Sequence, residues 1–244
     1  MSKHDYAALI NFNQQNRDEW VAEVAAKLPA GTLILDVGAG ECRYRPLFAH
    51  CIYKAHDFAQ YTGTQEGNLQ QAWKYCELDY VSDIVSIPVP NGTFDAVLCT
   101  EVMEHVPEPI RALKEIGRIL KPGGKLFLSA PLGSGLHQQP YHFYGGFTPH
   151  FYNRFLKEAG FSEISVQPNG HFFRLLLQEL HRGASLLYQK QRYPLWNPKR
   201  WFIRAALSQY VAEWLTQADD SIPVEEFTVD YFVEAVKELS SSAV

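Results

Sequence analysis

Long apolar runs are absent from this chain of 244 residues. A helix that spans a bilayer needs about 20 consecutive, mostly apolar residues, and no stretch of the sequence meets that requirement. The N-terminal sequence Met1-Ser2-Lys3-His4-Asp5 is polar and lacks the apolar segment of a secretory signal. We therefore expect a protein that neither crosses a membrane nor is secreted.

Positive charge is also scarce in this sequence. Lys and Arg number 22 against 27 Asp and Glu, which gives a net charge of −5 and an isoelectric point near 6.0. Domains that bind nucleic acid usually carry a concentrated basic excess. We therefore expect no nucleic-acid partner.

Paired cysteine motifs are missing as well. The four cysteines are Cys42, Cys51, Cys76 and Cys99, and none forms a Cys-x-x-Cys pair of the kind that binds zinc or exchanges disulfides. Their positions near predicted strands suit buried free thiols in a reducing compartment. The sequence thus predicts a cytoplasmic protein.

A turn with two glycines is the feature around which the chain is organised. Residues 33–37 form a short apolar run that predicts a buried strand, and Gly38 and Gly40 follow it. A dinucleotide-binding turn would have a third glycine three residues later, where this chain has Arg43. An NAD-dependent oxidoreductase is therefore disfavoured, although a purely structural turn stays open.

An acidic residue at the end of the next predicted strand points to adenosine. Residues 52–57 predict that strand, and Asp57 lies about twenty residues beyond the glycine turn, where a carboxylate can accept hydrogen bonds from both ribose hydroxyls. Phe58 follows it and is expected in the same site. The alternative is a solvated aspartate of the kind that is common where strands end.

Several motifs in one order resemble the class I S-adenosylmethionine-dependent methyltransferases, type 11-like. Asp36 with the glycine turn is similar to motif I of that family, and Asp83, five residues before Pro88, is similar to its adenine-binding region. Phe94-Asp95, opening an apolar strand, Glu104-His105 and Lys121-Pro122-Gly123-Gly124 follow in the family's order. The resemblance runs from about residue 31 to residue 166.

The resemblance implies S-adenosylmethionine as cofactor and a set of residues that hold it. By that resemblance Asp83 accepts a hydrogen bond from the adenine amino group, and Ile84 packs on the ring. The expected cofactor-binding residues are Asp36, Gly38, Ala39, Gly40, Arg43, Asp57, Phe58, Asp83, Ile84, Thr100 and Glu101.

The resemblance also implies an α/β fold: a Rossmann-like, seven-stranded, mostly parallel sheet whose seventh strand is antiparallel, with a helical insertion between strands six and seven. We expect a single methyltransferase domain over residues 1–244. Its parts are an N-terminal helix (1–30), a cofactor-binding core (31–170), a helical insertion of two helices (171–222), and a closing strand with a tail (223–244).

The loop after the fifth predicted strand, residues 133–148, is expected to form the acceptor pocket, and we call it the acceptor loop. His137 and His142 in this loop are the favoured bases, ahead of His105, and Tyr141 is a further catalytic candidate. Simple hydrogen bonding by these histidines is an equal alternative. Many relatives have an Asp where this chain has His142, so their substrates are not carried over.

A metal is not expected at this loop. The spacing of His137, His142 and His150 matches no compact ligand pattern, and no acidic residue is adjacent to them in the sequence. We therefore predict no metal site. The possibility stays open because some methyltransferases use a metal to orient a diol, and retained activity after chelation would exclude it.

Basic and aromatic residues gather in the expected insertion, between residues 174 and 204. The favoured interpretation is a solvated helical cap or a homodimer surface, and the alternative is contact with an anionic membrane surface or an acidic partner.

For the whole chain we predict methyl transfer to an oxygen or nitrogen atom of a small molecule. A non-catalytic cofactor-binding scaffold and a Rossmann oxidoreductase are the alternatives.

Overall fold

The computed structural model describes residues 6–63, 74–190, 196–224 and 226–239. The chain divides into two compact units, which we describe separately. Residues 20–167 and 230–244 form the sheet unit, and residues 1–19 and 168–229 form the helical unit. The helices that we predicted as an insertion thus pack, with residues 1–19, as a unit of their own.

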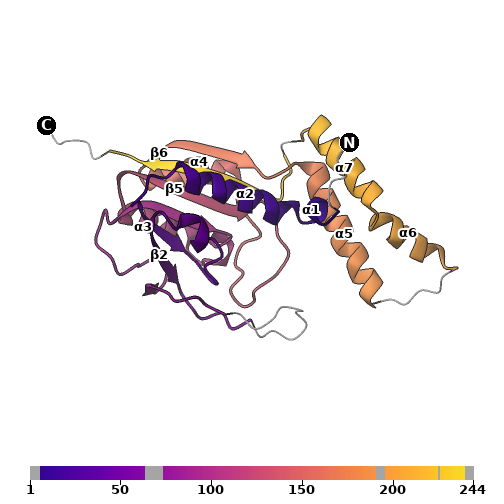
Figure 1. Ribbon diagram of the computed structural model, residues 1–244, viewed down its shortest axis with the longest axis horizontal. Coiled ribbons are helices and arrows are strands. Elements are labelled where there is room, and N and C mark those ends of the chain that lie inside the picture. The colour runs from indigo at the N-terminus through magenta and orange to yellow at the C-terminus, as the bar shows by residue number, and fades with distance from the viewer. Residues whose placement is uncertain (1–5, 64–73, 191–195, 225, 240–244) are drawn as a thin grey trace. The chain divides into compact units, whose positions relative to one another are not determined.

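The sheet has seven strands in the order β3-β2-β1-β4-β5-β7-β6 (Figure 1). The strands β1, β2, β3 and β4 pair in parallel, as do β4 and β5, whereas β7 runs antiparallel to β5. This order and the antiparallel β7 confirm the predicted fold class. The strands are β1 (Leu33–Val37), β2 (Ile52–Asp57), β3 (Tyr80–Val81), β4 (Phe94–Thr100), β5 (Leu120–Pro131), β6 (Phe161–Pro168) and β7 (Asp230–Lys237).

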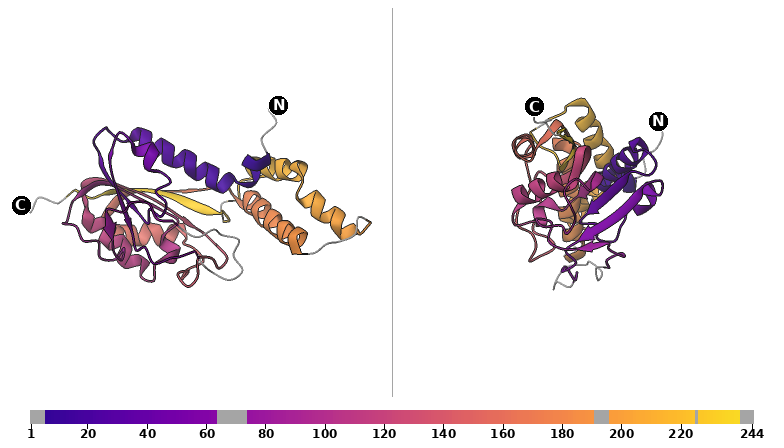
Figure 2. Two further views of the ribbon diagram at one scale, coloured as in Figure 1. Left: turned by 60° about the horizontal axis from the view of Figure 1, so that its bottom comes forward. Right: turned by 90° about the vertical axis from the view of Figure 1, so that its left-hand side faces the viewer.

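Alternate residues along the central strands build two separate cores, one on each face of the sheet. Ile34 and Leu98 pack with α2 (Phe12–Lys27), whereas Leu35 and Val97 pack with α3 (Pro109–Ile119) and α4 (Pro149–Glu158). Because successive side chains of a strand point to opposite faces, a continuous apolar run serves both cores. Figure 2 shows α2 and the pair α3 and α4 on opposite sides of the sheet.

The segment after the glycine turn contains one short helical element. It forms a single 3-10 turn, η1 (Arg45–Phe48), which opens with Pro46 and ends on the buried Phe48. Only residues 38–51 separate β1 from β2, and the turn itself uses several of them. The chain therefore returns to β2 after a single helical turn.

The helical unit consists of α1 (Tyr6–Ile10), the first turns of α2, α5 (Phe172–Lys190), α6 (Pro198–Ala206) and α7 (Gln209–Ser221). Leu9, Leu177 and Leu215 form its core. We expected two helices between residues 171 and 222, and the second is divided because the Ser208 hydroxyl accepts a hydrogen bond from the Val211 N–H and caps α7. No helix in the described ranges combines the length and apolarity that a bilayer span requires.

The cysteines depart from the prediction of four free thiols. Cys42 and Cys76 form a disulfide, whereas Cys51 and Cys99 are free. The Cys76 N–H also donates to the Gly40 carbonyl oxygen at 3.0 Å, so the segment that leads to β3 lies against the glycine turn. The prediction of free thiols is wrong for this pair, and the cytoplasmic location that it supported stays a prediction.

Candidate functional site

The glycine turn lies at the carboxyl end of β1 and is held by the end of β2. The N–H groups of Gly38 and Ala39 both donate to the His56 carbonyl oxygen, at 2.8 and 2.9 Å. Gly38 has a φ of +74°, and a Cβ at this position would overlap the Val102 side chain, which follows β4. Glycine is therefore required at position 38 both by the backbone conformation and by the lack of space for a Cβ. No sequence pattern predicted the close approach of Val102 to Gly38.

Asp57 lies directly beside this turn. Its side chain is buried, and its two carboxylate oxygens accept from the N–H groups of Gly40 and Ala59, each at 3.0 Å. A carboxylate has about four lone-pair sites, so acceptor capacity remains for a ligand's hydroxyl groups. The turn and Asp57 thus fit an adenosine group, because one offers close backbone approach and the other acceptor capacity.

Asp36, on β1, is buried in the same region and has an unusual protonation equilibrium. Burial raises the pKa of Asp36 to about 7, and the Tyr53 hydroxyl, which donates to its carboxylate, partly offsets this rise. Tyr53 was not among the predicted site residues. Its position was predictable in principle, because Ile34 pairs with Tyr53 across β1 and β2 and Asp36 lies two residues further on the same face.

The raised pKa of Asp36 predicts a stability that depends on pH. Neutral Asp36 favours the folded state, so its contribution is complete below pH 4 and is lost as the pH rises through about 7. We expect Asp36→Asn, which keeps an acceptor for Tyr53, to lose less free energy of unfolding than the parent protein between pH 4 and pH 8. Urea denaturation at a series of pH values measures this difference, and parallel curves for the two proteins would contradict it.

The other predicted cofactor residues lie around the carboxyl ends of β3 and β4. Asp83 is exposed and accepts from the Val85 N–H at 3.1 Å, whereas Ile84 is buried in the core beside α3. Thr100 ends β4, and Glu101 follows with a φ of +54° and accepts from the Ser129 hydroxyl at 2.8 Å. Arg43 is exposed just beyond the glycine turn. A positive φ at a glutamate is uncommon and typical of functional sites. The cofactor roles of all these residues stay predictions.

The acceptor loop is attached to the segment after β4. The N–H groups of Phe143 and Tyr144 donate to the Glu104 carbonyl oxygen at 2.9 and 3.2 Å, within the 3-10 turn η2 (Met103–His105). The Tyr141 ring meets the Phe58 ring edge to face, with centroids 4.9 Å apart. Because Phe58 follows Asp57, the loop predicted for the acceptor reaches the residues predicted for the cofactor.

The three histidines predicted as candidate bases come together. The ring centroids of His137 lie 4.8 Å from His105 and 4.5 Å from His142, and those of His105 and His142 are 5.7 Å apart. Burial lowers the pKa of His105 to about 4, with further lowering by the two neighbouring rings. Burial also lowers the pKa of His142. His105 and His142 are thus neutral at pH 7 and have a ring nitrogen that can accept.

The hydrogen bonds of two of these rings fix which nitrogen can accept. His105 Nδ1 lies 2.7 Å from the Tyr141 carbonyl oxygen, and His137 Nδ1 lies 2.9 Å from the Gly135 carbonyl oxygen. A carbonyl oxygen only accepts, so in the neutral rings both Nδ1 atoms carry the hydrogen. The Nε2 atoms of His105 and His137 are therefore the acceptors. Sequence spacing does not predict this cluster, because its members come from two segments that only the fold brings together.

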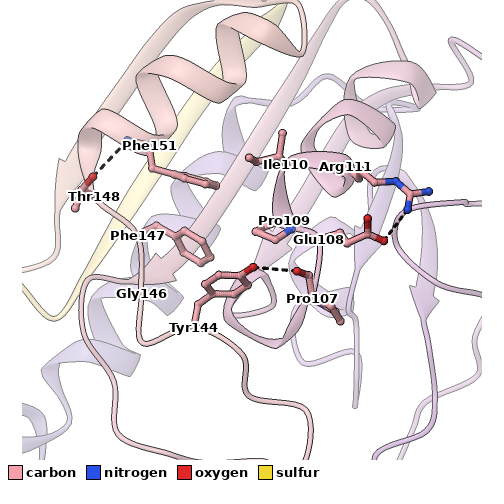
Figure 3. A pocket seen from close by; sticks show the side chains of 10 residues that line it. All are labelled: Pro107, Glu108, Pro109, Ile110, Arg111, Tyr144, Gly146, Phe147, Thr148 and Phe151. Carbon is pink, nitrogen blue, oxygen red and sulfur yellow. Dashed lines mark hydrogen bonds and ion pairs between the residues drawn. The ribbon is translucent and has the colours of Figure 1, made fainter.

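A separate hollow of about 530 Å³ opens between the start of α3 and the end of the acceptor loop (Figure 3). Ile110, Phe147 and Phe151 line it, and the Tyr144 hydroxyl donates to the Pro107 carbonyl oxygen at its edge. None of the residues predicted for the cofactor or for catalysis lines this hollow. It is therefore distinct from the cluster of histidines.

The strand order, the glycine turn at the end of β1 and the antiparallel β7 define a Rossmann-like methyltransferase fold. A family described as "Methyltransferase domain" matches residues 35–128. An S-adenosylmethionine-dependent methyltransferase from Archaeoglobus fulgidus superposes with a TM-score of 0.55 at 16% identity, covering 96% of this chain and all of that one. The [4+2]-cyclase SpnF superposes with a TM-score of 0.53 at 21% identity, over 93% of this chain and 83% of that one.

Curated relatives are named for two acceptor chemistries. A ubiquinone biosynthesis O-methyltransferase of Xanthomonas axonopodis pv. citri is 37% identical over 111 residues, which are 43% of this chain and 46% of that protein. A sarcosine/dimethylglycine N-methyltransferase of Halorhodospira halochloris is 25% identical over 169 residues, 63% of this chain and 60% of that protein. The chain spans about half the length of these relatives. In residues 35–128 the chain is thus similar to a methyltransferase domain, and in its fold to S-adenosylmethionine-dependent methyltransferases.

Proposed function

We propose that this protein transfers a methyl group from S-adenosylmethionine to an oxygen or nitrogen atom of a small-molecule acceptor. The observation that carries the proposal is the acceptor loop, which contacts Phe58 through Tyr141 and presents the histidine cluster beside η2. Relatives named as O- and N-methyltransferases support both acceptor atoms.

The proposed roles follow from the hydrogen bonds of the site. The glycine turn and Asp57 would hold the adenosyl part of the cofactor, which supplies an electrophilic methyl group when bound. His137 is the favoured base for a hydroxyl acceptor, because its Nδ1–H is directed at the Gly135 carbonyl oxygen and its Nε2 can take a proton. An amine acceptor would need only to enter the site unprotonated.

A labelled-methyl assay tests this proposal. The purified protein is incubated with methyl-labelled S-adenosylmethionine and a metabolite extract, and mass spectrometry identifies any compound that gains the label. We expect one small molecule to be labelled, and labelling to fall with His137→Gln. Cofactor binding in calorimetry without any labelled product would overturn the proposal and favour the non-catalytic scaffold.

A Rossmann oxidoreductase is not favoured. Arg43 occupies the place of the third glycine, and the curated relatives are named as methyltransferases. A binding assay separates the methyltransferase from the oxidoreductase. We expect S-adenosylmethionine to bind under conditions in which NADH does not.

We further propose that the helical unit docks on an anionic membrane surface through α6 and α7. Six aromatic side chains of this unit are more than half exposed, and Lys199, Arg200 and Arg204 lie on α6, which contains no acidic residue. Exposed aromatics with basic neighbours suit a headgroup layer. The exposed aromatics are Tyr188, Trp196, Trp201, Phe202, Tyr210 and Trp214.

Part of the basic charge between residues 174 and 204 has internal partners. Arg174 lies over the Phe12 ring and 3.8 Å from the Asp220 carboxylate, and Arg182 pairs with Glu179. The docking proposal therefore rests on the exposed aromatic side chains, among them Trp201 and Phe202 of α6. We expect the protein to float with vesicles that contain phosphatidylglycerol, and Trp201→Ser with Phe202→Ser to abolish flotation. Absence of flotation contradicts membrane docking, and a concentration-dependent dimer lost in the same variant would favour a homodimer surface instead.

A further inference from the structure

Three side chains with metal-ligating atoms converge where η2 meets the acceptor loop. One ligand atom from each of Glu104, His105 and His137 lies within 4.8 Å of the other two, and the Glu104 Oε1 to His105 Nε2 distance is 3.7 Å. Ligands about 2.0–2.2 Å from a tetrahedral metal are separated by roughly 3.3–3.6 Å. The group is thus within about 1 Å of a metal-binding arrangement.

The ring orientations match those of metal-bound histidines. Histidines that bind a metal through one nitrogen commonly donate the other N–H to a backbone carbonyl or a carboxylate, which fixes the ring and the tautomer. His105 and His137 both do this with Nδ1, toward the carbonyl oxygens of Tyr141 and Gly135. Their Nε2 atoms are left with lone pairs, and that of His105 faces the Glu104 carboxylate at 3.7 Å.

The surroundings of the group also favour a cation. The Glu104 side chain is 1% exposed, so its carboxylate acts at short range with little screening by water. His142 lies 4.5 Å from His137 between ring centroids, and its Nε2 is 3.1 Å from the Ser134 hydroxyl, so it lies beside the group without belonging to it. His150, the third histidine considered from the sequence, is exposed on α4 and is not part of the group.

We propose that Glu104, His105 and His137 bind a divalent transition-metal ion. Two imidazole nitrogens and one carboxylate oxygen are ligands of zinc, cobalt and ferrous iron, and three protein ligands leave a position open for an exogenous oxygen. The prediction of no metal site did not consider Glu104 and His105, because they lie more than 30 residues from the loop histidines in the sequence.

The open position gives the ion a function. An oxygen atom bound to a divalent metal ion loses its proton more readily, so an acceptor hydroxyl at this position would be oriented and ionised together. This role rests on the proposed methyl transfer, whereas metal binding itself does not. His137 would then act as a ligand in place of a free base.

Cobalt binding tests the site directly. The full chain, without a polyhistidine tag and after treatment with a chelator, is titrated with Co²⁺ while its visible absorption is recorded. We expect one equivalent of Co²⁺ to produce d–d bands of a four- or five-coordinate site, and Zn²⁺ to remove them. His137→Ala and Glu104→Gln should weaken binding by at least about 10-fold, whereas His150→Ala should bind as the parent does.

His137→Ala is the decisive variant, because His137 lies in a half-buried loop and not in the core of the sheet unit. Circular dichroism establishes that it is folded. Absence of the Co²⁺ bands in the parent protein, or equal bands in folded His137→Ala, would overturn the metal site. Metal binding without methyl transfer would overturn the proposed function alone, and methyl transfer that persists in the metal-free protein would overturn the assigned role of the ion.

Discussion

Gly38→Ala should weaken S-adenosylmethionine binding by roughly 100-fold, which corresponds to about 3 kcal/mol. A Cβ at this position would overlap Val102, and the residue would have to hold a φ of +74° that alanine rarely adopts. Relief of either conflict moves the turn that the cofactor must approach. Isothermal titration calorimetry measures the loss.

Two further variants separate these causes. Gly31→Ala is the matched control, because Gly31 also has a positive φ, +80°, but a Cβ there would meet no atom within 4 Å. We expect it to bind the cofactor as the parent does. Val102→Ala introduced into Gly38→Ala removes the overlap and should restore part of the affinity. An affinity of Gly38→Ala equal to that of the parent would show that the turn is not the binding element.

Asp57→Ala is expected to weaken cofactor binding by a similar factor, on the order of 100-fold. The carboxylate accepts from the Gly40 and Ala59 N–H groups, so its removal both releases the turn and deletes the proposed acceptor for the ribose hydroxyls. Hydrogen bonds to charged groups contribute about 1.5–3 kcal/mol each, and two of them account for the expected loss. Calorimetry with S-adenosylmethionine and with S-adenosylhomocysteine should give the same ratio.

Glu41→Ala controls for charge in this second prediction. Glu41 follows the turn directly and is exposed, so its removal changes the local charge by the same amount without touching the hydrogen bonds of Asp57. Asp57→Asn keeps one carbonyl acceptor and should fall between the parent and Asp57→Ala. Equal losses in Glu41→Ala and Asp57→Ala would attribute the effect to charge alone and remove Asp57 from the site.

The central strands were predictable because they are buried on both faces. Residues 33–37 and 96–100 are nearly continuous apolar runs that end at glycine or polar residues, a pattern typical of the inner strands of a parallel sheet. The helix α3 follows the same rule, because Leu113 and Ile116 belong to an apolar stripe of helical period that the sheet buries. In these elements local pattern and tertiary burial agree.

The incorrect predictions concern elements whose structure depends on a single residue or on a contact between residues far apart in the sequence. The apolar residues keep a helical period through α6 and α7, so periodicity alone predicts one helix there. The Ser208 cap starts a second helix within that stretch. The pairing of Cys42 with Cys76 depends on the path of the chain after β2, which no local pattern records.

The residues of the candidate site were likewise predictable only in part. Asp36, the glycine turn and Asp57 were identified because each stands where an apolar strand ends. The partners Tyr53 and Val102 were missed, since they act through contacts between neighbouring strands and loops. The histidines were identified individually from the sequence. That His105 and His137 lie close to Glu104 follows only from the folded structure.

The link between Cys42 and Cys76 makes a covalent ring of the segment between them. The ring spans a sequence separation of 34 residues and contains Asp57, while its closing residue Cys42 lies two positions after Gly40. Closing a loop of this length reduces the entropy of the unfolded chain by an amount worth about 4 kcal/mol at 25 °C. In the unfolded chain the glycine turn and Asp57 therefore stay tethered, and the search that reunites them on refolding is confined to a small volume.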